Sequence, residues 1–115
     1  MIRTITRNEI ERHLAMGTPM TLVEALPEKY YRDGHLPGAM HLPHDRVREL
    51  APERLPDRDA FIVVYCANAP CQNSRIAARE LEALGYTNVA EYVEGKQDWV
   101  DAGLPLERTA ASAAA

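Results

Sequence analysis

The chain has 115 residues, of which 46% are hydrophobic and 26% are charged, and its formal net charge is −4 at pH 7. This length suits one globular domain, and the negative charge argues against nucleic acid or an anionic membrane as the main partner. No stretch approaches the roughly 20 apolar residues that cross a bilayer, and the N-terminal residues lack the apolar segment of a signal peptide. We therefore expect a cytoplasmic protein.

The N-terminal segment predicts a strand, a helix and a second strand. Residues 2–5 are expected to form a brief strand. Thr6 and Glu9 have the spacing of a capping box, so a helix begins after Thr6, and Gly17 is expected to end it. Residues 21–25, TLVEA, then form the second strand.

The next segment is rich in turn residues. Pro27 lies where the first residue of a short helix is expected, and Gly34 closes that helix. Residues 35–42, HLPGAMHL, contain a Pro-Gly turn followed by a short apolar strand. Residues 45–50 can form a helix, and the proline-rich stretch 51–59 is expected to be a connecting loop.

The C-terminal half holds the longest apolar runs. Residues 61–65, FIVVY, are apolar without alternation, which favours a central strand that is covered on both faces. A helix is expected over 73–84, with Gly85 as its stop. Residues 89–93 form the last predicted strand, and residues 96–102 the last helix.

The alternation of strands and helices favours a parallel sheet flanked by helices, an α/β sandwich. Functional residues of such folds gather at the carboxyl ends of the strands. We find no internal repeat and expect a single domain over residues 1–108. The tail 109–115 has little to bury, so we expect it to be frayed.

Cys66 follows the central strand directly, and a helix begins about eight residues later. The intervening loop must turn back over the strand end, where backbone N–H groups and the helix dipole favour an anion. We expect this setting to stabilise the thiolate of Cys66 relative to a free thiol, whose pKa is about 8.5. The alternative is that Cys66 is a small buried side chain at a strand end.

Three segments resemble the rhodanese superfamily and follow its order. DGHLPGAMHLP resembles the signature GHIPGAINIP, and VVYC with its loop and a helix ending in ELEALGY is similar to the active-site strand, loop and helix. TNVAEYVEGKQDWVDAGLPLE resembles the closing strand, glycine turn and tryptophan before AGLP. The resemblance spans roughly residues 5–107 and implies a three-layer sandwich with about five mainly parallel strands.

The resemblance also implies an activity, that of a sulfurtransferase without cofactor or metal. Cys66 would carry a sulfane sulfur as a persulfide, taken from a small donor (thiosulfate, a persulfide or a polysulfide). A thiol or similar acceptor, which a sulfur-accepting protein could supply, would receive it. The resemblance assigns the substrate-binding loop to Ala67, Asn68, Ala69, Pro70, Gln72, Asn73, Ser74 and Arg75.

The sequence departs from the family at three places. Cys71 stands five residues after Cys66, where an arginine is common, and the loop ANAPCQNS before Arg75 carries no charge, which argues against efficient turnover of the thiosulfate dianion. Glu24 lies where an Asp-Val-Arg-like motif is usual, and we expect it to keep part of that motif's internal ion pairing. Lys96, beside the closing glycine, is expected to be a solvated surface residue; the alternative is that it supplies the missing charge of the loop.

Several readings stay open at this point. Cys71 can be a resolving thiol that attacks a persulfide or sulfenate on Cys66 and releases it as a disulfide, or it can simply pack. The whole chain can be a thiol–disulfide redox protein, or a non-catalytic rhodanese-like module that binds a partner. A metal site of Cys66, Cys71, His41 and His44 is weighed and set aside, and a phosphatase is rejected because Gln72 replaces the arginine that binds phosphate.

Overall fold

The computed structural model describes residues 2–108; the tail predicted to be frayed, residues 109–115, lies outside the described residues. Five strands form one sheet, with the order β1-β5-β4-β2-β3 and every pairing parallel. They are β1 (Arg3–Thr4), β2 (Thr21–Glu24), β3 (Met40–His41), β4 (Ile62–Tyr65) and β5 (Val89–Tyr92). The predicted α/β fold with a parallel sheet of about five strands is confirmed.

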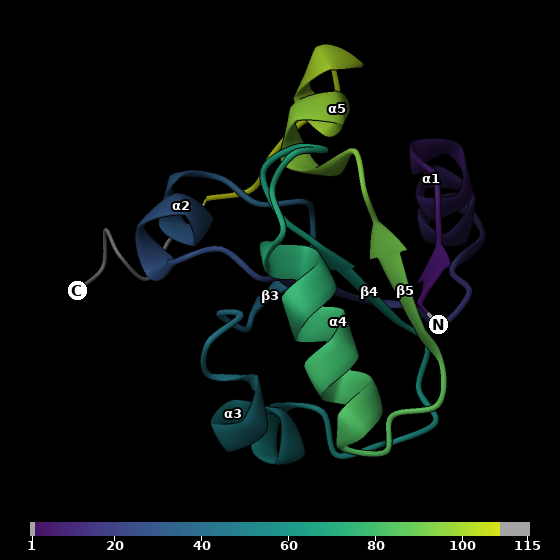
Figure 1. Ribbon diagram of the computed structural model, residues 1–115. Coiled ribbons are helices and arrows are strands. Elements are labelled where there is room, and N and C mark those ends of the chain that lie inside the picture. The colour runs from purple at the N-terminus through teal and green to yellow at the C-terminus, as the bar shows by residue number, and fades with distance from the viewer. Residues whose placement is uncertain (1, 109–115) are drawn as a thin grey trace.

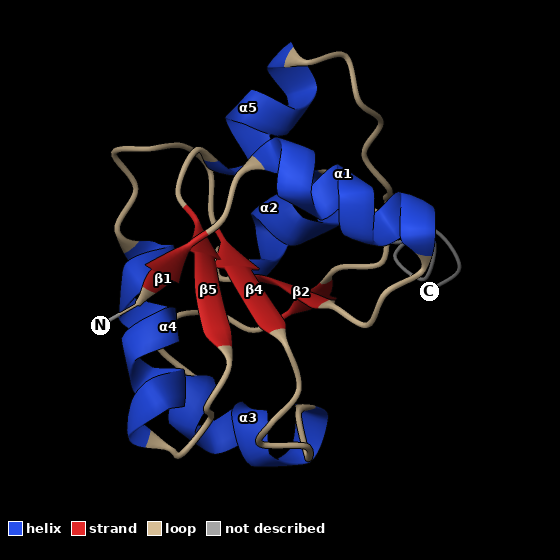
Figure 2. Cartoon of the chain, turned by 90° about the vertical axis from the view of Figure 1, so that its right-hand side faces the viewer, coloured by secondary structure: helices blue, strands red, loops and turns tan. Residues whose placement is uncertain are grey.

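Helices cover both faces of this sheet, which makes three layers (Figure 2). They are α1 (Arg7–Met16), α2 (Glu28–Asp33), α3 (Val47–Arg54), α4 (Asn73–Ala83) and α5 (Gly95–Asp101). The α3 and α4 helices lie on one face, and α1, α2 and α5 lie on the other (Figures 1 and 2). Within residues 2–108, no helix combines the length and the apolar character that a membrane crossing requires.

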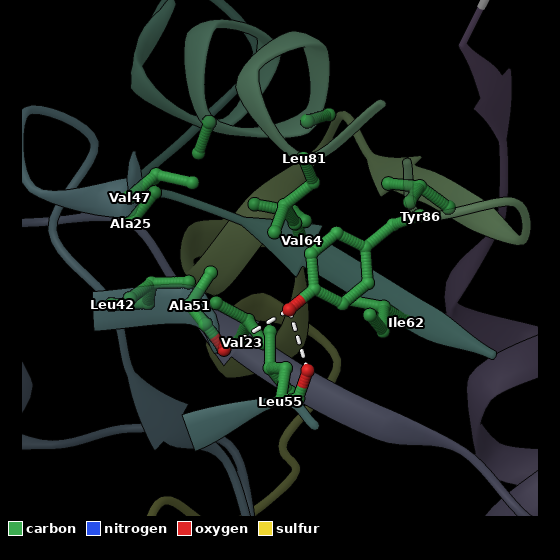
Figure 3. Packing of buried hydrophobic residues seen from close by; sticks show 13 residues of the cluster. Val23, Ala25, Leu42, Val47, Ala51, Leu55, Ile62, Val64, Leu81 and Tyr86 are labelled. Atoms are coloured by element: carbon green, nitrogen blue, oxygen red, sulfur yellow. Dashed lines mark hydrogen bonds between the residues drawn. The ribbon is translucent and has the colours of Figure 1, made fainter. Parts of the chain in front are cut away.

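The central strand β4 explains why its sequence is apolar without alternation. Its side chains belong in turn to two separate clusters of buried residues. Ile62 and Val64 pack toward α3 and α4, as Figure 3 shows, whereas Val63 and Tyr65 pack toward the opposite face. Because both faces are covered, the strand contains no polar position for solvent.

The first helix begins and ends where the sequence predicted. The backbone N–H of Glu9 donates to the side chain of Thr6, and the Glu9 carboxylate accepts from the Thr6 backbone, which completes the capping box. Gly17 ends the helix in the left-handed conformation, with φ of 68°.

The third helix corrects the sequence-based assignment. A helix was predicted over 45–50 with a loop behind it, but α3 continues for another turn through Pro52. The cause is tertiary: the Tyr86 hydroxyl donates to the carbonyls of Ala51 and Leu55, and the three residues pack together (Figure 3). Sequence periodicity carries no record of such a contact from a distant residue.

Candidate functional site

Cys66 lies immediately after β4, the central strand, at the carboxyl edge of the sheet. This is the edge at which parallel α/β folds place their sites. The residue begins the loop that leads into α4, and it is buried, with 1% of its surface exposed. The thiol therefore sits beneath the loop in the resting structure.

The start of α5 holds this loop in place. The backbone N–H of Lys96 donates to the carbonyl of Cys66 at 2.9 Å, and that of Gln97 donates to the carbonyl of Ala67 at 2.8 Å. Gly95 has φ of +68°, and a Cβ added there would lie 2.5 Å from the Cys66 carbonyl oxygen and 3.0 Å from the Asn68 nitrogen. Only glycine fits this close approach of two backbones.

The rest of the loop is mostly exposed. Ala67 is half-buried, while the next three residues and Gln72 are exposed. The backbone N–H of Cys71 donates to the Asn68 carbonyl at 3.1 Å, so this N–H forms a hydrogen bond within the loop itself. The assignment of the loop residues to substrate binding stays a prediction; their places are Ala67, Asn68, Ala69, Pro70 and Gln72 in the loop and Asn73, Ser74 and Arg75 in the first turn of α4.

A chain of hydrogen bonds leads from the thiol to a buried carboxylate. The Cys66 Sγ donates to Ser74 Oγ at 3.3 Å, and Ser74 Oγ donates to Glu91 Oε2 at 2.7 Å. Glu91 lies on β5 and is only 4% exposed, and Arg75 Nε stands 3.7 Å from its other oxygen. Sequence reasoning missed Glu91, although a carboxylate within the otherwise apolar strand VAEY was the signal that could have found it.

Burial raises the pKa of Cys66 to about 11. Cys71 adds to this increase, while the Ser74 hydroxyl and backbone oppose the increase. The expected stabilisation of the thiolate is therefore wrong for the resting protein, because desolvation under the loop outweighs the hydrogen bonds. At pH 7 a pKa of about 11 leaves roughly one thiolate in ten thousand.

Cys71 is half-buried, and neither cysteine is in a disulfide. Cys71 lies in the same loop as Cys66 and is one of the groups that raise the pKa of Cys66. A resolving thiol must come close to its target, and this role for Cys71 stays a prediction.

Lys96 is not a solvated surface residue, and that expectation is wrong. Its Nζ lies 3.0 Å from Glu24 Oε1, with its side chain 16% exposed and that of Glu24 fully buried. Tyr65 also donates to Glu24, at 2.9 Å, and Lys96 donates to the Tyr30 carbonyl. Burial raises the pKa of Glu24, whereas Lys96 opposes that rise. The expected internal ion pairing of Glu24 is confirmed, and the lysine replaces the missing arginine.

The two histidines of the metal hypothesis differ in their surroundings. His41 Nε2 lies 2.6 Å from the Leu26 carbonyl. His44 lies beside the start of α3, and its Nδ1 is buried with no hydrogen-bond partner among the described residues. Across residues 2–108, no group of three or more His, Cys, Asp or Glu side chains is arranged to hold a metal ion.

Comparisons with known proteins agree with this geometry. A family model for the rhodanese-like domain matches residues 6–102. The chain is 36% identical over 106 residues to the HTH-type transcriptional regulator Rv0324 of Mycobacterium tuberculosis, which covers 92% of this chain and 45% of that protein. It is 29% identical over 69 residues to the putative sulfur carrier protein YrkF of Bacillus subtilis, covering 60% of this chain and 35% of that protein.

Among solved structures, a thiosulfate sulfurtransferase from Pseudomonas aeruginosa superposes with a TM-score of 0.83 at 30% identity, over 93% of this chain and 20% of that chain. The chain spans less than half the length of the curated relatives named above. On the family match and the shared fold, the chain belongs to the rhodanese-like domain family.

Proposed function

We propose that the chain is a sulfurtransferase that carries a sulfane sulfur on Cys66. The observation that carries the proposal is the position of the thiol at the end of the central strand, beneath a loop that leads into a helix and beside Ser74. The names of two similar proteins, a putative sulfur carrier and a thiosulfate sulfurtransferase, support the same chemistry. A single domain over residues 1–108 and a cytoplasmic location complete the proposal.

The proposed reaction has two displacements at sulfur. The Cys66 thiolate attacks the outer sulfur of the donor, and the S–S bond of the donor breaks, so that the remainder leaves as sulfite or as a thiolate. The outer sulfur is then held as a persulfide on Cys66. An acceptor thiolate attacks that sulfur and releases Cys66 as a thiolate, ready for the next cycle.

The charges around the loop favour one class of donor. Lys96 is paired with Glu24, and Arg75 stands beside Glu91, so both nearby cations already face carboxylates. Thiosulfate is a dianion and would need a free cation at this site. We therefore expect glutathione persulfide or a polysulfide to load Cys66 faster than thiosulfate does.

Intact mass spectrometry tests the proposal. The reduced protein is incubated separately with thiosulfate and with glutathione persulfide, and a gain of about 32 Da, one sulfur atom, is expected. Cys66→Ser should abolish the gain, while the matched variant Cys71→Ser should retain it. Sulfur loading that persists in Cys66→Ser would contradict the proposal. No gain with either donor would instead favour a partner-binding module with two slowly reacting thiols.

A second candidate, a thiol–disulfide couple, is favoured by the place of Cys71 in the same short loop as Cys66, where it raises the pKa of Cys66. The Cys71 thiolate would attack the Cys66 sulfur of the persulfide, form a disulfide and release hydrosulfide. After treatment with a donor, the expected final mass is about 2 Da below that of the reduced protein, because the disulfide lacks two hydrogens. Cys71→Ser should not reach this mass. A loaded protein that keeps its added sulfur until a thiol acceptor arrives would exclude it.

A further inference from the structure

The hydrogen-bond chain behind Cys66 has a direction that the chemistry of its last member imposes. An ionised carboxylate can only accept hydrogen bonds. The 2.7 Å separation between Ser74 Oγ and Glu91 Oε2 is typical of a hydroxyl that donates to an ionised carboxylate. Ser74 has a single hydroxyl proton, and Glu91 receives it. The oxygen of Ser74 therefore turns its lone pairs toward Cys66.

Cys66 must then be the donor in the next bond, and a sulfur can donate only as a thiol. The 3.3 Å bond from Cys66 Sγ to Ser74 Oγ has this direction. A hydrogen bond donated by the Ser74 hydroxyl would lower the pKa of Cys66, but Glu91 receives that proton, so the hydroxyl cannot donate to a thiolate at the same time. We propose that Glu91 is a positioning residue that acts through Ser74 and favours the thiol form of Cys66.

Replacing the carboxylate by an uncharged amide reverses both hydrogen bonds. In Glu91→Gln the amide N–H can donate to Ser74 Oγ, and the Ser74 hydroxyl is then free to donate to Cys66. In that arrangement the Cys66 proton passes to solvent and the thiolate gains a hydrogen-bond donor. The inference rests on the proposed role of Cys66 as sulfur carrier, and it implies that the resting nucleophile is shielded from alkylation and oxidation.

Other charged and titratable groups surround these hydrogen bonds and modify the effect of Glu91 on Cys66. Arg75 of α4 lies 3.7 Å from Glu91 Oε1, but its side chain is 55% exposed, so solvent weakens its compensation of the carboxylate. Arg79 and Glu82, also on α4, line the same surface hollow as Glu91. Cys71, in the loop, also favours the neutral form of Cys66.

The experiment measures the rate of Cys66 alkylation by iodoacetamide from about pH 7 to about pH 10, where the rate follows the thiolate fraction of Cys66. A Cys71→Ser background leaves Cys66 as the one thiol of the chain. Glu91→Gln keeps the shape of the side chain and removes its charge. The expected result is an increase of about tenfold in rate at pH 7, as for removal of one nearby like charge. The pH profile of alkylation should lie at lower pH in the variant, because its Cys66 thiolate forms more readily.

A double-mutant cycle tests whether the effect passes through Ser74. In a Ser74→Ala background, Glu91→Gln should change the rate by less than about twofold. The matched control is Glu82→Gln, which removes a carboxylate from the same hollow and should leave the rate unchanged. Slower alkylation in Glu91→Gln would overturn the inference, because the carboxylate would then be accepting the proton. An undiminished effect without Ser74 would also overturn it.

Loosening of the fold cannot imitate the expected result, because it would speed alkylation equally at every pH. The measurement needs no sulfur donor, so it is separate from the test of the proposed function. A protein that gains sulfur on Cys66 but shows no acceleration in Glu91→Gln retains the proposed function and loses this inference. If Glu91→Gln does not fold, Arg75→Ala at the exposed cation provides the test. An unchanged or faster rate of Cys66 alkylation in that variant would contradict the proposed effect of Glu91 on Cys66.

Discussion

Two buried carboxylates lie in neighbouring parts of the sheet and have opposite consequences. Glu24, at the end of β2, is enclosed by Lys96 and Tyr65, and every partner within reach is a donor. Glu91, on β5, has one internal donor in Ser74 and one exposed cation in Arg75. The first carboxylate is paired with a buried ammonium, although burial still raises its pKa, and it supports the fold. The second has only an exposed cation beside it, and its charge acts on the nucleophile.

The difference shows how one small domain separates stability from reactivity. The ion pair of Glu24 with Lys96 ties β2 to the start of α5, on the face that α1, α2 and α5 cover. The chain of Glu91 and Ser74 lies on the α4 face, next to Cys66. Removing one partner of a buried ion pair is strongly destabilising, whereas an exposed partner contributes little.

The largest expected effect breaks the first of these two networks. Lys96→Met leaves Glu24 buried without its cation, and should lower the free energy of unfolding by about 3 kcal/mol. Burial already raises the pKa of Glu24 in the folded protein. A carboxyl whose folded pKa is raised favours folding below its unfolded pKa and opposes folding as the pH rises through the folded value. The loss should therefore be greater at about pH 8 than at about pH 5.

Urea unfolding at the two pH values measures this effect. The control is the pair Lys96→Met and Glu24→Gln in one chain, which removes both charges and should recover part of the loss. An equal loss at both pH values would show that Lys96 acts by packing and not by its charge.

A smaller effect is expected at the glycine that precedes Lys96. Gly95→Ala would place a Cβ against the Cys66 carbonyl and also requires a positive φ, so it should cost about 2–3 kcal/mol and slow sulfur loading of Cys66. Gly103→Ala is the matched control, because Gly103 has φ of +79° with no atom near its Cβ position. It should cost only about 1 kcal/mol and leave loading unchanged. If the two variants changed sulfur loading equally, the close packing of Gly95 against the Cys66 loop would not be needed for loading.

The smallest effect sharpens the second network. Arg75→Ala removes the exposed cation beside Glu91 and leaves the carboxylate less compensated. Cys66 alkylation at pH 7 should then slow by about two- to threefold, because exposed ion pairs are weak. This is opposite in sign to the effect expected from Glu91→Gln. Arg79→Ala, on the next turn of α4, serves as the comparison for a general loss of positive charge.

Local sequence signals determined much of this protein. The capping box at Thr6, the apolar run of β4 and the position of Cys66 after it follow from chemistry within a few residues, and each agrees with the structure. The family resemblance extends over nearly the whole chain, so the fold and its parallel sheet were predictable as well.

The tertiary structure alone decided the features that depend on contacts between distant residues. Tyr86 holds the last turn of α3, Lys96 is buried because Glu24 lies 72 residues away in sequence but 3.0 Å away in space, and Glu91 reaches Cys66 through Ser74. The pKa of Cys66 is raised for the same reason, since burial depends on what covers the thiol. Sequence patterns report local geometry, whereas desolvation and charge pairing are set by neighbours that only folding brings together.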